Sequence, residues 1–190
     1  MFVLITGGSG SGKSEYAENL AVGLAKDTGL PLYYVATMMP FGTEGKKRVE
    51  RHQKLRAGKG FTTIERYVNL KELMLPENGV VLLECLSNLT ANEMFEEKGA
   101  GDKTSEEVLL GVRKIRSGCR HLVVVTNDIF SDGVTYDKTT EQYQRYLGAV
   151  NQALAKEADE VTEVVCGIPL EIKTASEIES RGNRDEDTGC

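Results

Sequence analysis

Short apolar runs alternate with longer, more polar segments along most of this chain. Several runs are continuously hydrophobic, as in Val80-Val81-Leu82-Leu83 and Leu122-Val123-Val124-Val125. Such a run is typical of a parallel strand that helices cover on both faces, because neither face of the strand meets water. We therefore predict strands at residues 2–6, 32–37, 61–66, 80–85, 122–127, 161–166 and 170–173.

The segments between these runs have the length and spacing of helices. We predict helices at residues 13–27, 43–57, 69–75, 86–98, 104–117 and 138–157. Strands that alternate with helices form a doubly wound α/β fold, so we expect a mainly parallel sheet with helices on both faces. Ligands of such sheets bind beyond the carboxyl ends of the strands, and candidate functional residues are therefore expected there.

A glycine-rich segment directly follows the first predicted strand. Its residues are Gly7, Gly8, Ser9, Gly10, Ser11, Gly12, Lys13 and Ser14. This is the pattern G-x-x-x-x-G-K-[ST] between a strand and a helix, which is the context of a P-loop. Glycines let backbone N–H groups turn toward a phosphate, and the helix N-terminus adds partial positive charge. Lys13 can reach the β- and γ-phosphates and the Ser14 hydroxyl can hold Mg²⁺, so the sequence predicts a P-loop NTPase-like domain that binds a nucleoside triphosphate.

Composition narrows the class of protein. The 190 residues suit one domain, which we place at residues 1–173. The net charge of −6 argues against broad affinity for nucleic acids, and no apolar run approaches the ~20 residues that a membrane span needs. Four widely spaced cysteines and the lack of a signal peptide favour a cytoplasmic protein with reduced thiols. Residues 174–190 are polar and acidic, and we expect a flexible tail there.

His52 lies in a strongly basic segment, residues 46–56, that is predicted to be helical. Six of these eleven residues are Lys or Arg, and Arg48 and Arg51 are within about one helical turn of the imidazole. Such cations can hold a polyphosphate, and a neutral imidazole is a competent nucleophile toward phosphorus. From composition alone, however, a solvated basic helix face with an incidental histidine is the simpler interpretation.

Two carboxylates end predicted strands. Glu84 follows the apolar run 80–83, where P-loop enzymes keep the residue that organises Mg²⁺ or its water. Because Glu replaces the usual Asp, binding to nucleotide hydroxyls is equally open, and a solvent-exposed strand end is a further alternative. Glu65 has a comparable position in its strand. The tetrapeptide Thr126-Asn127-Asp128-Ile129 lacks the lysine of the guanine-reading N-K-x-D motif, which disfavours a regulatory GTPase.

A set of short segments follows one order along residues 1–173. They are Ile5-Thr6-Gly7-Gly8, Ser11-Gly12-Lys13-Ser14, Tyr34-Val35-Ala36-Thr37, Arg48-x-x-x-His52, Leu82-Leu83-Glu84-Cys85, Val125-Thr126-Asn127-Asp128, Asn151-Gln152, Ala158-Asp159-Glu160-Val161 and Cys166-Gly167-Ile168. In this set the chain resembles the bifunctional adenosylcobinamide kinase/adenosylcobinamide-phosphate guanylyltransferase family of cobalamin biosynthesis. A P-loop alone is shared by many kinases, whereas the arginine–histidine helix and the Leu-Leu-Glu-Cys strand are far more specific.

The resemblance implies a cytoplasmic α/β P-loop enzyme that forms a homo-oligomer, with a trimer as the expected state. It implies two reactions, which use Mg²⁺ and ATP or GTP. In the first, the aminopropanol hydroxyl of adenosylcobinamide is phosphorylated. In the second, GMP passes from GTP through a histidine to adenosylcobinamide phosphate, giving adenosylcobinamide-GDP. The partners would then be nucleotides and a small corrinoid, with no nucleic acid and no membrane span.

The family's functional residues carry over to particular positions. The guanylylated histidine matches His52, and the nucleotide-binding carboxylates match Glu84 and, allowing one inserted residue, Glu65. On this resemblance His52 is interpreted as the nucleophile. The full expected site has His52 and Lys13 as catalytic residues, Ser14 and Glu84 at the metal, and residues 7–14, Arg48, Glu65 and Glu84 at the nucleotide.

Two departures from the family pattern keep alternatives open. Arg51 precedes His52 where family members often carry a second histidine. The loop 128–135 lacks one glycine and a proline of the usual Glu-Val-Gly-x-Gly-Ile-Val-Pro. If that loop contacts the corrinoid, this departure bears on the identity of the acceptor, which is the part of the resemblance that it puts in question. The alternatives are a P-loop kinase of another small alcohol without guanylyl transfer, and a non-catalytic nucleotide-binding regulatory module.

Overall fold

The computed structural model describes residues 1–129 and 133–174, except for the side chains of Glu44, Lys46, Arg48 and Leu55. Its strands are β1 (Phe2–Thr6), β2 (Leu32–Ala36), β3 (Thr62–Glu65), β4 (Val80–Glu84), β5 (His121–Val125), β6 (Glu160–Val165) and β7 (Ile168–Lys173). Its α-helices are α1 (Lys13–Thr28), α2 (Gly42–Arg56), α3 (Leu86–Phe95), α4 (Thr104–Ser117) and α5 (Lys138–Glu157). The elements η1 (Leu70–Glu72) and η2 (Gly101–Lys103) are 3₁₀ turns.

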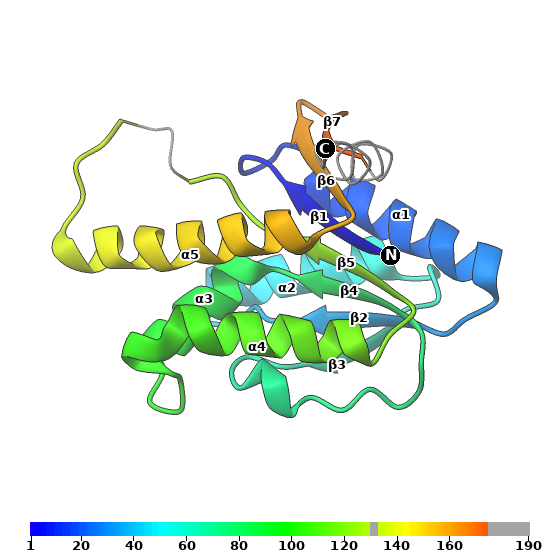
Figure 1. The fold of residues 1–190 in the computed structure, drawn as a ribbon, viewed down its shortest axis with the longest axis horizontal. Coiled ribbons are helices and arrows are strands. Elements are labelled where there is room, and N and C mark those ends of the chain that lie inside the picture. The colour runs from blue at the N-terminus through cyan, green and yellow to red at the C-terminus, as the bar shows by residue number, and fades with distance from the viewer. Residues whose placement is uncertain (130–132, 175–190) are drawn as a thin grey trace, which may run out of the picture.

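A seven-stranded sheet runs through the centre of the described residues, in the order β3-β2-β4-β5-β1-β6-β7 (Figure 1). Neighbouring strands from β3 to β6 are parallel, and β7 pairs antiparallel with β6 at the edge. The predicted α/β fold with a mainly parallel sheet is therefore confirmed. Because the parallel strands end at the same edge, the segments after β1, β4 and β5 are brought together there.

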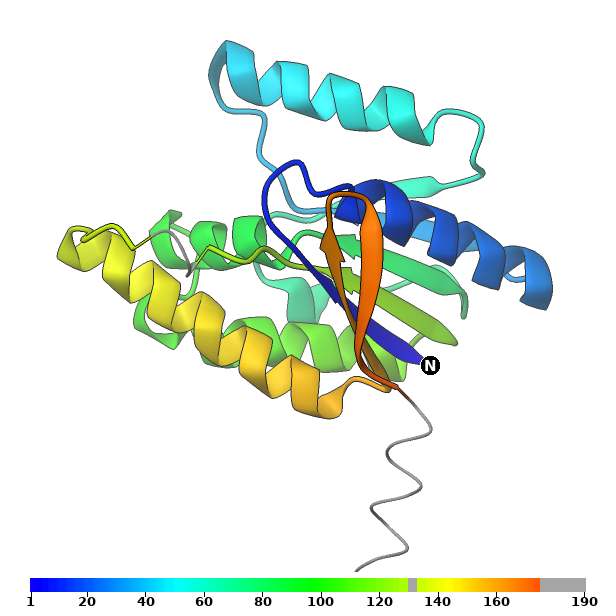
Figure 2. The ribbon, with the colours of Figure 1, turned by 90° about the horizontal axis from the view of Figure 1, so that it is seen from above.

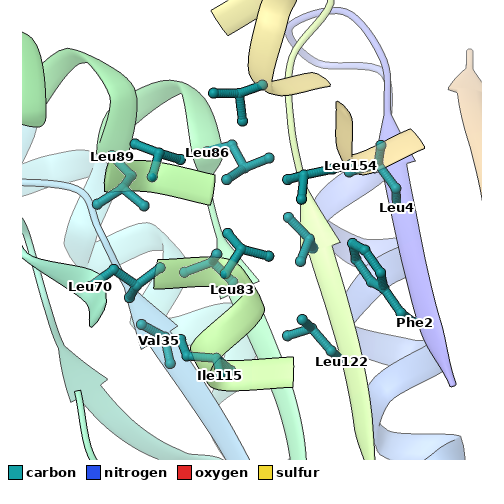
Figure 3. Packing of buried hydrophobic residues seen from close by; sticks show 14 of the residues in the cluster. Phe2, Leu4, Val35, Leu70, Leu83, Leu86, Leu89, Ile115, Leu122 and Leu154 are labelled. Carbon is teal, nitrogen blue, oxygen red and sulfur yellow. The ribbon is translucent and has the colours of Figure 1, made fainter. Parts of the chain in front are cut away.

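Helices cover both faces of the sheet, with α1 and α2 on one side and α3, α4 and α5 on the other (Figure 2). Alternate side chains of each strand enter opposite cores, as Phe2 and Leu4 do on one face and Val3 and Ile5 on the other. Figure 3 shows the core beneath α3, α4 and α5. Two buried faces explain why the strand sequences are continuously apolar.

Helix α2 differs from the other helices in how little of it is buried. Among the α2 side chains that the structure describes, only Arg56 is buried, and the others are exposed or half-buried. The helix stands beyond α1 on its side of the sheet (Figure 2). None of its described side chains belongs to either apolar core. Helix α2 is therefore not held by the packing that holds the rest of the domain.

The predicted helix at 69–75 was wrong, because only the 3₁₀ turn η1 forms there. Asn69 adopts a left-handed conformation (φ 54) and Leu73 is extended, so the turn cannot be continued at either end. Pro76 also disfavours a helical conformation in the residue before it. Leu70 is nevertheless fully buried, which explains why the segment appeared helical by its apolar spacing.

The predicted helix at 86–98 is also too long, since α3 ends at Phe95. Glu96 is extended (φ −79, ψ 146), and the chain then turns back on α3. A Cβ atom at Gly99 would lie 2.5 Å from the carbonyl oxygen of Glu93, so this return requires glycine. No helix in the described ranges combines the length and the apolar character that crossing a membrane requires. Residues 175–190, most of the predicted tail, lie outside the described residues.

Candidate active site

The P-loop joins β1 to α1 at the carboxyl edge of the sheet, where β1 lies between β5 and β6. Gly7 passes so close to β6 that a Cβ atom would lie 2.6 Å from the carbonyl oxygen of Val164. Gly12 precedes α1 in a left-handed conformation (φ 91), which glycine adopts without steric cost. The Gly167 N–H donates to the Ser11 carbonyl at 2.8 Å. These contacts fix the path of the loop between β6 and the start of α1.

Lys13 lies over this loop with its ammonium turned inward. The residue is only 8% exposed, and Nζ donates to the carbonyl oxygen of Gly8 at 2.9 Å. Burial lowers the pKa of Lys13 from its ordinary value of 10.5, while the acidic groups of Cys85 and Glu84 oppose that shift. A phosphate in the loop would supply the negative charge that favours the ammonium form.

Glu84, at the end of β4, contacts side chains from three other elements. Its Oε1 accepts a hydrogen bond from the Ser14 hydroxyl of α1 at 2.5 Å, and its Oε2 accepts one from the Tyr34 hydroxyl of β2 at 2.9 Å. The Nδ1 atom of His52 in α2 lies 3.8 Å from Oε1. The carboxylate is buried, so these groups have little competition from water. The structure thus brings together three residues that the sequence predicted as functional: Ser14, His52 and Glu84.

The imidazole of His52 is partly shielded from solvent. Its Nδ1 is buried and has no hydrogen-bond partner among the described residues, whereas the side chain as a whole is 26% exposed. Because Nδ1 faces the carboxylate of Glu84, a proton on Nδ1 would leave the lone pair on Nε2. The arrangement can therefore present Nε2 to a substrate.

Ser14 and Glu84 were predicted to hold Mg²⁺, and their oxygens are of the hard type that this ion prefers. Mg²⁺ commonly takes one or two protein ligands and completes its coordination with phosphates and water. In the described ranges, no cluster of three or more His, Cys, Asp or Glu side chains is suited to a metal. The donors therefore fit an ion that arrives with a nucleotide.

The remaining predicted residues lie at different distances from this centre. Glu65 ends β3 and is exposed, and its Oε2 accepts a hydrogen bond from the Tyr67 hydroxyl at 2.8 Å. Both Glu65 and Glu84 pair in register with Ala36 of β2, on either side of it, so their backbones are about 10 Å apart. Arg48 lies in α2, but its side chain is outside the described part of the structure.

Two site residues were missed in the sequence. The guanidinium carbon of Arg56 lies 3.5 Å from the ring centroid of Tyr34, whose hydroxyl holds Glu84. Burial is the main cause that raises the pKa of Tyr34, and the negative charge of Glu84 is the second. The hydroxyl therefore keeps its proton and can donate it in a hydrogen bond. The available signal was the spacing of His52 and Arg56, since residues four apart share one face of a helix.

Further polar groups lie at the carboxyl ends of β2, β4 and β5. The Thr37 hydroxyl donates to the carbonyl of Cys85 and accepts its N–H, at 2.8 and 2.7 Å. The Asn127 amide donates to the Ser87 hydroxyl at 2.5 Å, which joins the end of β5 to α3. Burial raises the pKa of the Cys85 thiol, so it stays protonated. The loop 128–135 that departs from the family pattern includes residues 130–132, which lie outside the described residues.

Comparison with known proteins places these features in a family. The model of "Cobinamide kinase / cobinamide phosphate guanyltransferase" matches residues 3–172. The bifunctional adenosylcobalamin biosynthesis protein CobU of Escherichia coli (strain K12) is 33% identical over 189 residues, which cover 91% of this chain and 100% of that protein. CobU of Salmonella typhimurium is 30% identical, covering 91% and 100%. CobP of Pseudomonas aeruginosa is 27% identical, covering 90% and 96%. The chain belongs to the cobinamide kinase / cobinamide phosphate guanyltransferase family.

Proposed function

We propose that this chain phosphorylates the aminopropanol hydroxyl of adenosylcobinamide and then transfers GMP from GTP to the product, with His52 as the covalent carrier of GMP. Membership of the family supports the pair of activities. The route through His52 rests on one observation, which is that Glu84 contacts both the P-loop serine and the imidazole. A nucleotide phosphate held at Ser14 would therefore lie near the nitrogen that attacks it.

The phosphorylation step requires that the hydroxyl be aligned with the γ-phosphate and that the negative charge of the phosphates be neutralised. The backbone N–H groups of the P-loop and the ammonium of Lys13 would hold the β- and γ-phosphates of ATP or GTP. The hydroxyl oxygen of the corrinoid forms a bond to the γ-phosphorus and its proton is released to solvent, while the bond between the γ-phosphorus and the bridging oxygen of the β-phosphate breaks. Lys13 then stabilises the charge on the departing nucleoside diphosphate.

The transfer step needs a nucleophile and a partner for the charge that develops on it. Nε2 of His52 forms a bond to the α-phosphorus of GTP as the bond to pyrophosphate breaks. The imidazole then carries positive charge, and Glu84 beside Nδ1 stabilises it. A phosphate oxygen of the corrinoid next attacks the same phosphorus, and the P–N bond breaks to restore the free histidine. Mg²⁺ held at Ser14 and Glu84 would neutralise charge on the polyphosphate.

The test is transfer of label from α-labelled GTP to the protein. The expected product is a phosphoramidate, whose label is lost in acid and stable in alkali. His52→Asn should acquire no label and transfer no GMP, yet should still phosphorylate the corrinoid. Labelling of His52→Asn at the normal rate would refute the role of His52. Phosphorylation without labelling of the normal protein would favour the simple kinase, and binding without either reaction would favour the regulatory module.

We also propose that the working form is a homo-oligomer, a trimer, in the cytoplasm. The family resemblance supports this proposal, and the exposed apolar side chains of the edge strand β7 support association with another subunit. Ile168, Leu170 and Ile172 alternate along this strand and are 61%, 45% and 59% exposed. Such a stripe is suited to being covered by another subunit. The mass measured by light scattering tests this, and a monomer at all protein concentrations would contradict it.

A further inference from the structure

The C-terminal end of α2 is joined to the domain by charged side chains. Arg56, the last residue of the helix, stacks on Tyr34, and Lys59 follows it by three residues. The Lys59 N–H donates to the Arg56 carbonyl at 3.0 Å, so the two residues belong to one turn of chain. Contacts at this end of α2 can therefore fix how the exposed helix lies relative to the rest of the domain (Figure 2).

Lys59 makes an ion pair with a carboxylate that is almost completely buried. Its Nζ lies 2.6 Å from Oε2 of Glu18, and Glu18 is 1% exposed. The other oxygen of Glu18, Oε1, is buried without a hydrogen-bond partner among the described residues. A buried ion pair is weak evidence for stability, because desolvation offsets the attraction. Such a pair can instead specify one arrangement of the two segments that it joins.

In both α1 and α2, a residue of the candidate active site lies one helical turn from a charged residue that contacts another element. On α1, Ser14 and Glu18 are separated by four positions, and on α2 His52 and Arg56 are separated by four. Residues at this spacing share one face of a helix, so Glu18 lies on the face of α1 that carries Ser14, and Arg56 lies on the face of α2 that carries His52. The Glu18–Lys59 pair thus joins the helix of Ser14 to the end of the helix of His52.

We propose that Glu18 and Lys59 are positioning residues for guanylyl transfer. Their ion pair holds the end of α2 against α1, and this keeps the imidazole of His52 beside Glu84 and the P-loop. The inference rests on the proposed role of His52. Phosphorylation of the corrinoid uses the P-loop and Lys13 and does not use the imidazole. The ion pair therefore sets the rate of one of the two reactions and leaves the other unchanged.

The experiment measures both reactions in the same protein preparations. Lys59→Met should slow labelling from α-labelled GTP by about tenfold to a hundredfold, since small misplacements of a nucleophile have effects of this size. The rate of corrinoid phosphorylation should stay within about twofold of normal. Lys59→Arg, which keeps the charge, should recover most of the labelling rate. Lys71→Met is the matched control, because Lys71 also lies 2.6 Å from a glutamate, Glu107, but on the opposite face of the sheet.

A second variant separates positioning from folding. Lys59→Met leaves the carboxylate of Glu18 buried without its partner, which alone can destabilise the domain. The double variant Glu18→Gln/Lys59→Met removes that charge and should fold, yet its labelling should remain slow. If the double variant restores both reactions, or if every variant labels at the normal rate, the positioning role is refuted. If the normal protein transfers GMP without ever acquiring label, the role of His52 fails first, and this inference fails with it.

Discussion

The Nδ1 atom of His52 lies 3.8 Å from Oε1 of Glu84, and the same oxygen accepts the hydroxyl of Ser14. One buried carboxylate thus lies between the helix that carries the proposed nucleophile and the loop that would hold the phosphates. A negative charge in this place can hold a proton on Nδ1 and stabilise an imidazole that has become cationic. Glu84 is therefore expected to take part in both proposed reactions.

Replacing Glu84 by Gln keeps the size of the side chain and removes its charge. We expect Glu84→Gln to slow labelling from α-labelled GTP by at least about a hundredfold, because the cationic imidazole loses its partner. Corrinoid phosphorylation should fall as well, since the same oxygen belongs to the proposed Mg²⁺ site. Glu72→Gln is the control, as Glu72 is exposed and pairs with Arg66 instead. Normal labelling by Glu84→Gln would show that the carboxylate plays no part in the transfer.

Lys13→Met should reduce the rate of corrinoid phosphorylation by about 10²–10³-fold, the usual effect of losing one donor to a transition-state charge. Its effect on stability should be small, because the variant loses the hydrogen bond to the Gly8 carbonyl but also removes a buried charge. Burial lowers the pKa of Lys13, so the unfolded chain binds that proton more tightly than the folded protein does. The ammonium therefore costs stability at neutral pH, and a methionine removes the cost. A normal phosphorylation rate, or a variant that is strongly destabilised, would contradict this account.

Tyr34→Phe should separate the two contacts that Tyr34 makes. The ring that supports Arg56 remains, while the hydrogen bond to Oε2 of Glu84 is lost. Because that bond is made to a charged and buried group, we expect the free energy of unfolding in urea to fall by about 1.5–3 kcal/mol. Tyr33→Phe is the control, since Tyr33 neighbours it in β2 but faces the opposite core. An equal loss in both variants would mean that the bond to Glu84 adds nothing.

The parts of this structure that were predicted correctly are those that depend on short, continuous segments of the sequence. Most of the strands follow from apolar runs, and the P-loop follows from glycines at a fixed spacing between a strand and a helix. The spacing of apolar residues around Leu70 favoured a helix at 69–75. The helix does not form because Asn69 adopts a left-handed conformation and Pro76 disfavours a helical residue before it. Periodicity reports which residues are buried, and it does not report where a helix stops.

Sequence patterns could not predict the contacts between residues that form the site. Ser14 and Glu84 are 70 positions apart, and Glu18 and Lys59 are 41 apart. No local rule relates residues at these separations, because only the order of the strands brings them together. His52 could be named as a candidate from its basic segment and from the family resemblance. Its contact with Glu84, and the contacts of Glu84 with Tyr34 and of Tyr34 with Arg56, could be found only in the folded structure.

Glu93 offers a prediction about stability that is independent of the active site. It lies in α3 at 1% exposure, and one of its oxygens accepts the N–H of Asn69. Burial raises the pKa of Glu93 above its ordinary value of 4.5, against the backbone hydrogen bonds from Asn69 and Ala100. The folded protein therefore binds this proton more tightly than the unfolded chain does. Stability should fall as pH rises from 4.5 through the raised pKa, and stay lower above it.

Glu93→Gln removes this titration, so its stability relative to the normal protein, measured as the midpoint of urea unfolding, should rise as pH increases above 4.5. Glu157 provides a control of opposite sign. The hydrogen bonds from Arg113 lower the pKa of Glu157, so its contribution is present above the unfolded pKa and is lost as pH falls. Glu157→Gln should therefore lose stability relative to the normal protein at the higher pH. If both variants change in the same direction with pH, then burial does not govern the proton on Glu93.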